Sequence, residues 1–244
     1  MNQTLTLATP SGEMGIHIVR PDGDGPYRVI VFFHHGPGLD EPSKSGMQLL
    51  ADAGYYVVSH DRYHRETPWL VVTPEMRQDP EAMQRFMGAL MGTTDDMVDA
   101  DLDALLHHVD ADPAARRAPM GCIGFCIGAR SVVVTMARRA DRFAAGVGMH
   151  PSFCTTDQPD SPHLLVPAIT GTLYVAFGSE DAMQSPAANV AFIDAVRAMS
   201  GGRGEADVLD GANHGFAVPN GPAYHEDAAK VAYAKAFARF EALR

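Results

Sequence analysis

Short, nearly unbroken apolar runs alternate along the chain with stretches in which apolar residues recur at helical spacing. Strands that are covered on both faces show unbroken apolar runs, whereas strands with one face in solvent alternate apolar and polar residues. The predicted strands are Val29–Phe33, Tyr55–Ser59, Met120–Gly124, Thr172–Phe177 and Ala206–Leu209, and the predicted helices are Asp95–Val109, Pro186–Met199 and Ala223–Leu243. This alternation predicts an α/β fold, with a mostly parallel central sheet flanked by helices.

Two segments depart from this alternation. Thr4–Ala8 and Gly15–Arg20 flank the turn Thr9-Pro10-Ser11-Gly12, which predicts a β-hairpin. Residues 61–94 follow neither period and contain three prolines, four methionines and the one tryptophan, Trp69. We interpret them as a short cap-like insertion of loops and one short helix over the carboxyl ends of the strands, where open α/β sheets bind ligands. The 244 residues are expected to form a single domain, 1–244.

The segment Gly124-Phe125-Cys126-Ile127-Gly128 joins a predicted buried strand to a predicted helix, Ala129–Ala140. A sharp strand–turn–helix junction with glycines two residues before and after the central residue is the nucleophile-elbow pattern, here with cysteine. The helix N-terminus would favour the thiolate form of Cys126. The alternative is that Cys126 is a small buried apolar residue, the role expected of Cys122 and Cys154.

A cysteine nucleophile needs a base and an orienting acid, which follow the nucleophile in the chain order acid, then base. Asp181 follows the predicted strand Thr172–Phe177, and His214 lies in the loop after Ala206–Leu209. We therefore predict His214 as the base and Asp181 as the acid. Glu180 is the substitute acid, and Asp210 is a weaker rival because it is close in sequence to His214.

With these motifs the chain resembles the dienelactone hydrolase family of α/β-hydrolases over roughly residues 12–243. The resemblance is carried by Gly-Phe-Cys-Ile-Gly-Ala-Arg at 124–130, Gly-Ser-Glu-Asp at 178–181, His-Gly-Phe at 214–216, Gly54-Tyr55 and Asp61-Arg62-Tyr63. It implies hydrolysis of carboxylic esters or lactones by Cys126, Asp181 and His214. It also implies an oxyanion hole formed by the backbone N–H of Ile127 and an N–H of the loop after the first long buried strand.

That loop is His34-His35-Gly36-Pro37-Gly38-Leu39, and we assign the second oxyanion donor to Gly36. The chain departs from the family at two positions. The glutamate that pairs with the thiol in dienelactone hydrolase proper is His35 here, and the arginine expected four residues after His214 is Val218. Because Val218 carries no charge, we expect neutral esters or lactones to be preferred over anionic ones. Arg62, Arg77 and Arg85 are the alternative cations.

The substrate site is expected to include His35, Trp69, Phe125 and Phe216. His35 would line the cleft and bind the substrate or the thiol, and Trp69 would form an apolar wall together with the methionines of the insertion. The expected partner is a small-molecule ester or lactone. We expect no cofactor. We also expect no metal, because adjacent histidines such as His34 and His35 point in opposite directions on a strand and cannot easily share one ion.

Composition excludes several other classes of protein. The formal net charge is −11 and there is no run of Lys or Arg, so neither nucleic acid nor an anionic membrane is an expected partner. The three cysteines lack the spacing of a zinc site or a disulfide framework. The first residues lack the pattern of a signal peptide, and no apolar run approaches 18 residues, which predicts a cytoplasmic protein. We expect a monomer or homodimer.

Two other functions remain open at this point. An acyltransferase or a thioesterase could use the same triad, because only the acyl acceptor or the leaving group would differ. A non-catalytic binding or redox-sensing protein could keep the fold, although the presence of elbow, acid and base together argues against it.

Overall fold

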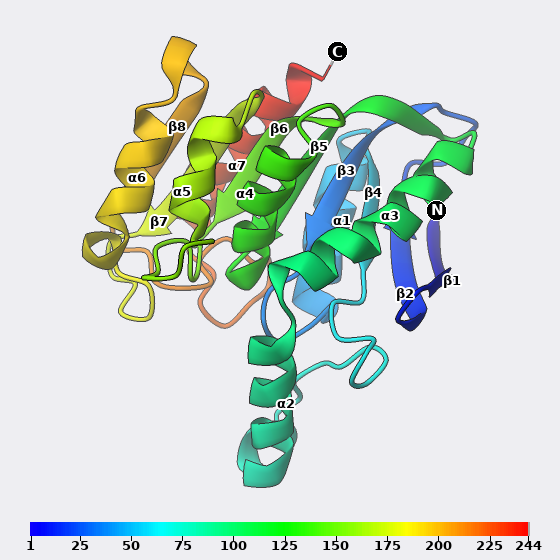
Figure 1. Ribbon diagram of the computed structural model, residues 1–244, viewed down its shortest axis with the longest axis horizontal. Coiled ribbons are helices and arrows are strands. Elements are labelled where there is room, and N and C mark those ends of the chain that lie inside the picture. The colour runs from blue at the N-terminus through cyan, green and yellow to red at the C-terminus, as the bar shows by residue number, and fades with distance from the viewer. Residues whose placement is uncertain (244) are drawn as a thin grey trace.

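A computed structural model describes residues 1–243 and contains one eight-stranded sheet with helices on both faces (Figure 1). The strand order is β1-β2-β4-β3-β5-β6-β7-β8. β1 pairs antiparallel with β2, and β2 pairs antiparallel with β4, whereas all the other pairs are parallel. The strands are β1 (Asn2–Thr9), β2 (Gly12–Val19), β3 (Tyr27–Phe33), β4 (Tyr56–His60), β5 (Ala115–Phe125), β6 (Phe143–Met149), β7 (Thr172–Gly178) and β8 (Gly204–Leu209).

Two hydrophobic cores lie on opposite faces of this sheet. The helices are α1 (Glu41–Asp52), α2 (Pro80–Gly92), α3 (Asp95–Ala111), α4 (Ile127–Arg138), α5 (Pro162–Leu165), α6 (Val190–Arg197) and α7 (Glu226–Glu241). Buried side chains of α3, α4 and α6 form one core with the sheet, and those of α1 and α7 form the other. The central strands β3, β5, β6 and β7 contribute to both cores, which explains their unbroken apolar sequences.

The predicted mostly parallel α/β sheet is therefore confirmed, and so are the N-terminal hairpin, α3 and α7. Two of the longer elements, in addition to the short helix α5, were not predicted. The strand β6 has the sequence Phe-Ala-Ala-Gly-Val-Gly-Met, in which small residues replace the β-branched ones that normally mark a strand. The helix α1 contains Gly46 beside the aromatic ring of Phe32, and this close approach weakens its helical sequence pattern.

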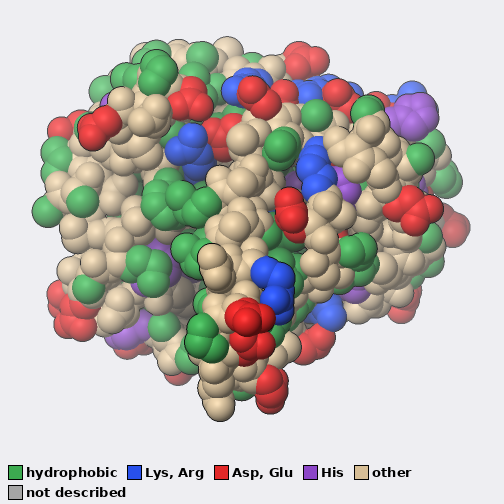
Figure 2. Space-filling model, turned by 60° about the horizontal axis from the view of Figure 1, so that its bottom comes forward, with side chains coloured by type: hydrophobic (Ala, Val, Ile, Leu, Met, Phe, Trp, Pro, Cys, Tyr) green, Lys and Arg blue, Asp and Glu red, His purple; other side chains and the backbone are tan. Residues whose placement is uncertain are grey.

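Residues 61–94 contain a short 3-10 turn (Met76–Gln78) and α2, which extends below the sheet in Figure 1. A small hydrophobic cluster of their own, centred on Tyr63 and Phe86, holds these residues together. Figure 2 brings this edge of the molecule forward and shows hollows beside the projecting segment, with acidic and basic side chains around them. The insertion thus adds a wall beside the carboxyl ends of the parallel strands.

Candidate active site

The junction between β5 and α4 is a strained turn. Cys126 has φ 55° and ψ −119°, a conformation that residues other than glycine rarely adopt, and it directly precedes α4. A Cβ on Gly124 would lie 2.1 Å from the carbonyl oxygen of Gly128, and a Cβ on Gly128 would lie 2.2 Å from the carbonyl oxygen of Phe33. Both glycines are therefore required for the close contact between β5, α4 and β3 that presents Cys126 at the sheet edge.

The thiol of Cys126 is surrounded by groups that favour the thiolate. Its Sγ lies 3.2 Å from Oγ of Ser152, and both the Ile127 backbone N–H and His214 interact with it. Burial alone would raise the pKa of the thiol. The interactions with His214, Ser152 and Ile127 outweigh burial, and the pKa of Cys126 is lowered.

The other two cysteines lie in different surroundings. Cys122 and Cys154 are fully buried, and burial raises the pKa of both thiols. Neither is placed to react with a ligand from solvent, whereas Cys126 is partly exposed. The structure thus separates one activated thiol from two that serve as small core residues.

His214 and Asp181 form the pair expected from the sequence. Nδ1 of His214 lies 2.7 Å from Oδ2 of Asp181, and Oδ1 of Asp181 accepts hydrogen bonds from the backbone N–H groups of Met183 and Gln184. Asp181 is buried, whereas the rival acids Glu180 and Asp210 are both exposed. The structure therefore pairs Asp181, and neither rival, with His214.

The pKa of His214 is raised to about 9. Burial lowers this pKa, but the hydrogen bond to Asp181 and the interaction with Cys126 raise it by more. The same hydrogen bond contributes to lowering the pKa of Asp181 against the opposing effect of burial. The pKa of Cys126 is thus lowered and that of His214 raised, the two directions that favour a thiolate–imidazolium pair.

A second histidine in the site was not foreseen. His150 follows β6, has φ 39° and is 1% exposed. Its ring meets that of His214 edge to face at 4.8 Å between centroids. Neither ring nitrogen of His150 has a hydrogen-bond partner among residues 1–243, and burial together with the charge of His214 holds the pKa of His150 well below its usual value. His150 is therefore neutral and packs against His214.

The loop after β3 is held in place by side chains around it. The hydroxyl of Tyr63 donates to the carbonyl oxygen of Gly36 at 2.7 Å, which anchors the loop at the residue whose N–H is the expected second oxyanion donor. Nε2 of His35 lies 2.9 Å from Oδ2 of Asp40, so a carboxylate of its own loop is the partner of His35. The thiol of Cys126 has its hydrogen-bonding neighbour elsewhere, in Ser152 of the loop after β6.

The expected substrate residues occupy different places. The rings of Phe125 and Phe216 are buried in the core. Their centroids lie 5.8 Å and 5.7 Å from the centroid of the His150 ring, so both rings pack against His150. Trp69, which has φ 53°, packs its ring against Gly15 of β2. Direct contacts of these three rings with a substrate stay predictions. Val218 is 5% exposed and packs in the core, so its side chain does not lie on the molecular surface.

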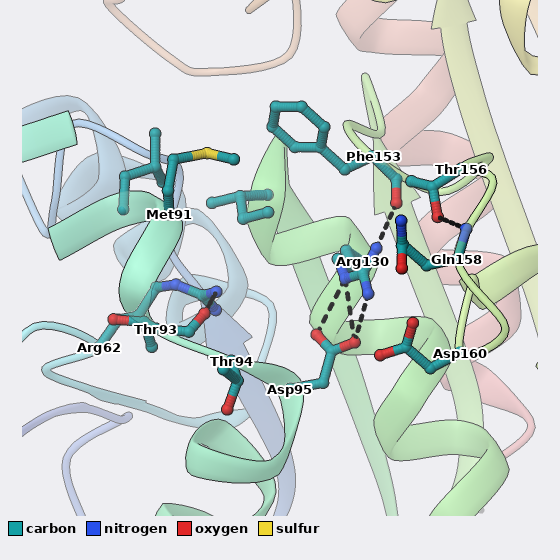
Figure 3. Close-up of a pocket in the computed structure, with 12 residues that line it drawn as sticks. Arg62, Met91, Thr93, Thr94, Asp95, Arg130, Phe153, Thr156, Gln158 and Asp160 are labelled. Atoms are coloured by element: carbon teal, nitrogen blue, oxygen red, sulfur yellow. Dashed lines mark hydrogen bonds and ion pairs between the residues drawn. The ribbon is translucent and has the colours of Figure 1, made fainter. Parts of the chain in front are cut away.

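A cavity of about 370 Å³ opens beside the elbow (Figure 3). Ile127 and Phe153, which neighbour Cys126 and Ser152 in sequence, form part of its lining. The end of α2 and the following loop form another part, including Met91 and Thr93. Residues of the 61–94 segment therefore line a cavity next to the elbow residue Ile127.

Residues 1–243 contain no cluster of three or more His, Cys, Asp or Glu side chains arranged to hold a metal ion. His34 and His60 are buried, and burial lowers the pKa of His34 to about 3 and that of His60 to about 4. In the same residues no helix has the length and apolar character needed to cross a membrane.

A mostly parallel sheet with a cysteine elbow after β5, an acid after β7 and a histidine after β8 defines an α/β-hydrolase. The profile of the dienelactone hydrolase family matches residues 14–243. The chain belongs to the dienelactone hydrolase family, whose members hydrolyse ester bonds, and the resemblance noted from the sequence is confirmed.

The chain is also similar to individual proteins and solved structures. A Synechocystis sp. protein described as a candidate carboxymethylenebutenolidase is 24% identical over 237 residues, which cover 95% of this chain and 92% of that protein. The crystal structure of a candidate dienelactone hydrolase from Klebsiella pneumoniae has a TM-score of 0.84 at 20% identity, covering 99% of this chain and 98% of that one. Dienelactone hydrolase from Anabaena variabilis has a TM-score of 0.67 at 16% identity, covering 100% and 99%.

Proposed function

We propose that this protein hydrolyses carboxylic esters or lactones through a thioester on Cys126, with His214 as acid and base and Asp181 as its orienting partner. One observation carries the proposal. The strained elbow presents a partly exposed thiol of lowered pKa to a histidine that Asp181 holds at 2.7 Å.

In the first half of the reaction the thiolate of Cys126 attacks the carbonyl carbon of the ester. The backbone N–H groups of Ile127 and Gly36 would stabilise the negative oxygen of the tetrahedral intermediate, a contribution of roughly 3–4 kcal/mol for each donor. The C–O bond to the alcohol then breaks, and the leaving alkoxide takes the proton of the His214 imidazolium. In a lactone the alcohol stays attached to the acyl group.

In the second half neutral His214 accepts a proton from water, and the resulting hydroxide attacks the thioester. The C–S bond breaks, the carboxylic acid leaves, and the thiolate–imidazolium pair is restored. Asp181 keeps the Nδ1–H tautomer of His214 in place throughout and stabilises its charged form.

The test compares Cys126→Ala with Cys122→Ala and Cys154→Ala on 4-nitrophenyl esters and simple lactones. Cys126→Ala removes the nucleophile and should lower kcat by at least about 1,000-fold, because the groups of a triad act as a unit. Circular dichroism would confirm that each variant is folded. The two control variants should retain turnover. If folded Cys126→Ala keeps more than a few per cent of the activity, the proposal is wrong.

A further inference from the structure

Asp61 directly follows β4 and is a buried carboxylate without a cation beside it. Its side chain belongs to a residue that is 2% exposed. The basic side chains of His64 and Arg65 follow closely in sequence, but both pair with Asp101. Within residues 1–243 no ion pair involves Asp61. Burying a carboxylate is costly unless hydrogen bonds stabilise it, so the hydrogen-bond partners of Asp61 indicate its role.

Both oxygens of Asp61 accept hydrogen bonds from backbone N–H groups of the segment that follows β4. Oδ1 accepts from the N–H of Tyr63 at 3.0 Å, and Oδ2 accepts from the N–H of Trp69 at 2.5 Å. Burial raises the pKa of Asp61, and these two hydrogen bonds oppose that effect. One carboxylate therefore fixes the backbone of this segment at two points.

The same segment is tied to the loop after β3, residues 34–39, which we call the oxyanion loop because it contains the expected donor Gly36. The hydroxyl of Tyr63 donates to the carbonyl oxygen of Gly36 at 2.7 Å. Further along the segment, the backbone N–H of Val72 donates to the carbonyl oxygen of Pro37 at 2.8 Å. These two tethers hold consecutive residues of the oxyanion loop.

Trp69 supports the second tether. It has φ 53°, which is uncommon for a residue other than glycine, and its N–H is bound by Asp61. Its ring lies so close to Gly15 of β2 that a Cβ on Gly15 would be 2.3 Å from the ring. The next residue is Leu70, whose carbonyl oxygen would lie 2.2 Å from a Cβ on Gly38. The oxyanion loop is therefore packed directly against the turn that Asp61 stabilises.

We propose that Asp61 is a positioning residue for the oxyanion loop, and that it holds Tyr63 and Trp69 so that the two tethers place the N–H of Gly36. The inference rests on the proposed ester hydrolysis, in which this N–H stabilises the negative oxygen of the tetrahedral intermediate. Asp61 acts through the loop and takes no part in the bonds that form or break. A displaced donor stabilises the developing charge less well, so a shift of the loop lowers the rate and not the affinity for substrate.

The test compares ester hydrolysis with thiol alkylation in Asp61→Asn. An amide has one accepting oxygen, so this variant keeps one of the two backbone hydrogen bonds and sets an NH2 group against the other N–H. Hydrolysis forms an oxyanion, whereas iodoacetamide reacts with the thiolate at a saturated carbon and needs no oxyanion donor.

For 4-nitrophenyl acetate, kcat of Asp61→Asn should fall about 10- to 100-fold, less than for complete loss of a donor, with KM nearly unchanged. The interaction that is weakened exists only in the transition state, which explains this division between kcat and KM. The alkylation rate of Cys126 should stay close to that of the wild type, because the side chains that lower its pKa against burial, His214 and Ser152, are unchanged.

Asp112→Asn is the matched control. Asp112 also accepts hydrogen bonds at both oxygens, from the backbone N–H of Ala114 and from the hydroxyl of Tyr56, but it lies at the amino ends of β4 and β5. Its kcat and alkylation rate should stay close to those of the wild type. Tyr63→Phe removes only the hydroxyl tether and should show a smaller loss of kcat, again without a change in alkylation.

Equal losses of hydrolysis and alkylation in folded Asp61→Asn would overturn the inference, because Asp61 would then support the whole site and not the loop. An unchanged kcat in Asp61→Asn or in Tyr63→Phe would also overturn it, and so would an equal loss of kcat in Asp112→Asn. Circular dichroism checks that each variant is folded, and if Asp61→Asn does not fold, the ratio of hydrolysis to alkylation in Tyr63→Phe decides. A wild-type protein that is alkylated at Cys126 but cleaves no ester would instead overturn the proposed hydrolysis, and this inference with it.

Discussion

At the scale of single residues, the reactivity of Cys126 depends on groups that are far apart in the sequence. Cys126, Asp181 and His214 could be predicted because each follows a strand pattern in the order that the fold requires. Ser152 and His150 could not be predicted, since they follow the unrecognised strand β6 and match no spacing rule. The partner of His35 could not be predicted either, because only the folded loop brings Oδ2 of Asp40 to 2.9 Å from Nε2 of His35.

Ser152→Ala should raise the pKa of the Cys126 thiol. The Ser152 hydroxyl lies 3.2 Å from Sγ and favours the thiolate, so its removal leaves the charged form less stable. The measurement is the rate of alkylation by iodoacetamide as a function of pH, followed by the mass of the modified protein. Ser59→Ala is the control, because Ser59 is equally buried but its hydroxyl has no partner within residues 1–243. An unchanged alkylation profile in Ser152→Ala would contradict this role.

The pH dependence of kcat/KM should have an alkaline limb near 9, the pKa of His214. His214 is protonated below this pH and can give its proton to the leaving alkoxide, and activity is lost as pH rises through about 9. Asp181→Asn removes the carboxylate that raises this pKa, so the alkaline limb should move to lower pH. The change should also lower kcat by roughly 1,000- to 10,000-fold, because the amide favours the wrong tautomer.

Glu180→Gln is the control for the acid. Glu180 is exposed and does not contact His214 in the structure, so its pH profile and kcat should stay close to those of the wild-type protein. A larger loss in Glu180→Gln than in Asp181→Asn would move the acid one residue upstream.

At the scale of elements, the strand–elbow–helix unit was the most predictable part of the chain. Its glycines, its buried strand and the following helix are contiguous in sequence, so one local pattern contains all of the information. β6 was not predicted because its alanines and glycines carry little strand signal. Glycine is required at position 146 because of a neighbouring helix: a Cβ there would lie 2.8 Å from the side chain of Met136 of α4. Packing against residues distant in sequence therefore determines the strand conformation of β6, which local propensity does not indicate.

Gly128→Ala should destabilise the protein, because its new Cβ would lie 2.2 Å from the carbonyl oxygen of Phe33. We expect the free energy of unfolding to fall by about 2–3 kcal/mol, the usual cost of overpacking. Gly88→Ala is the matched substitution in α2, where a Cβ would meet nothing within 4 Å. There the free energy of unfolding should rise by about 0.5–1 kcal/mol, the helix propensity gained. Chemical denaturation of both variants measures these free energies. Equal changes in the free energy of unfolding would contradict the packing described for the elbow.

At the scale of the whole molecule, charge and substrate preference have to be treated separately. The net charge of −11 belongs to the whole chain, whereas the cavity beside the elbow is lined by two arginines and two aspartates, whose formal charges balance. Sequence alone gave the fold class and the family, because the motifs span most of the chain. It could not give the preferred charge of the substrate. That property depends on how the charged side chains around the site pair with one another, and pairing is visible only in the folded protein.

The most direct test of the account is to trap the acyl-enzyme. Rapid acid quenching of the wild-type protein during turnover of a slowly hydrolysed ester, followed by mass spectrometry, should show one added acyl group. Peptide mapping should place it on Cys126, and hydroxylamine should remove it as it removes thioesters. Cys126→Ala should show no adduct under the same conditions. An acyl group on Ser152 or on any other residue, or turnover by folded Cys126→Ala at more than a few per cent of the wild-type rate, would contradict hydrolysis through Cys126.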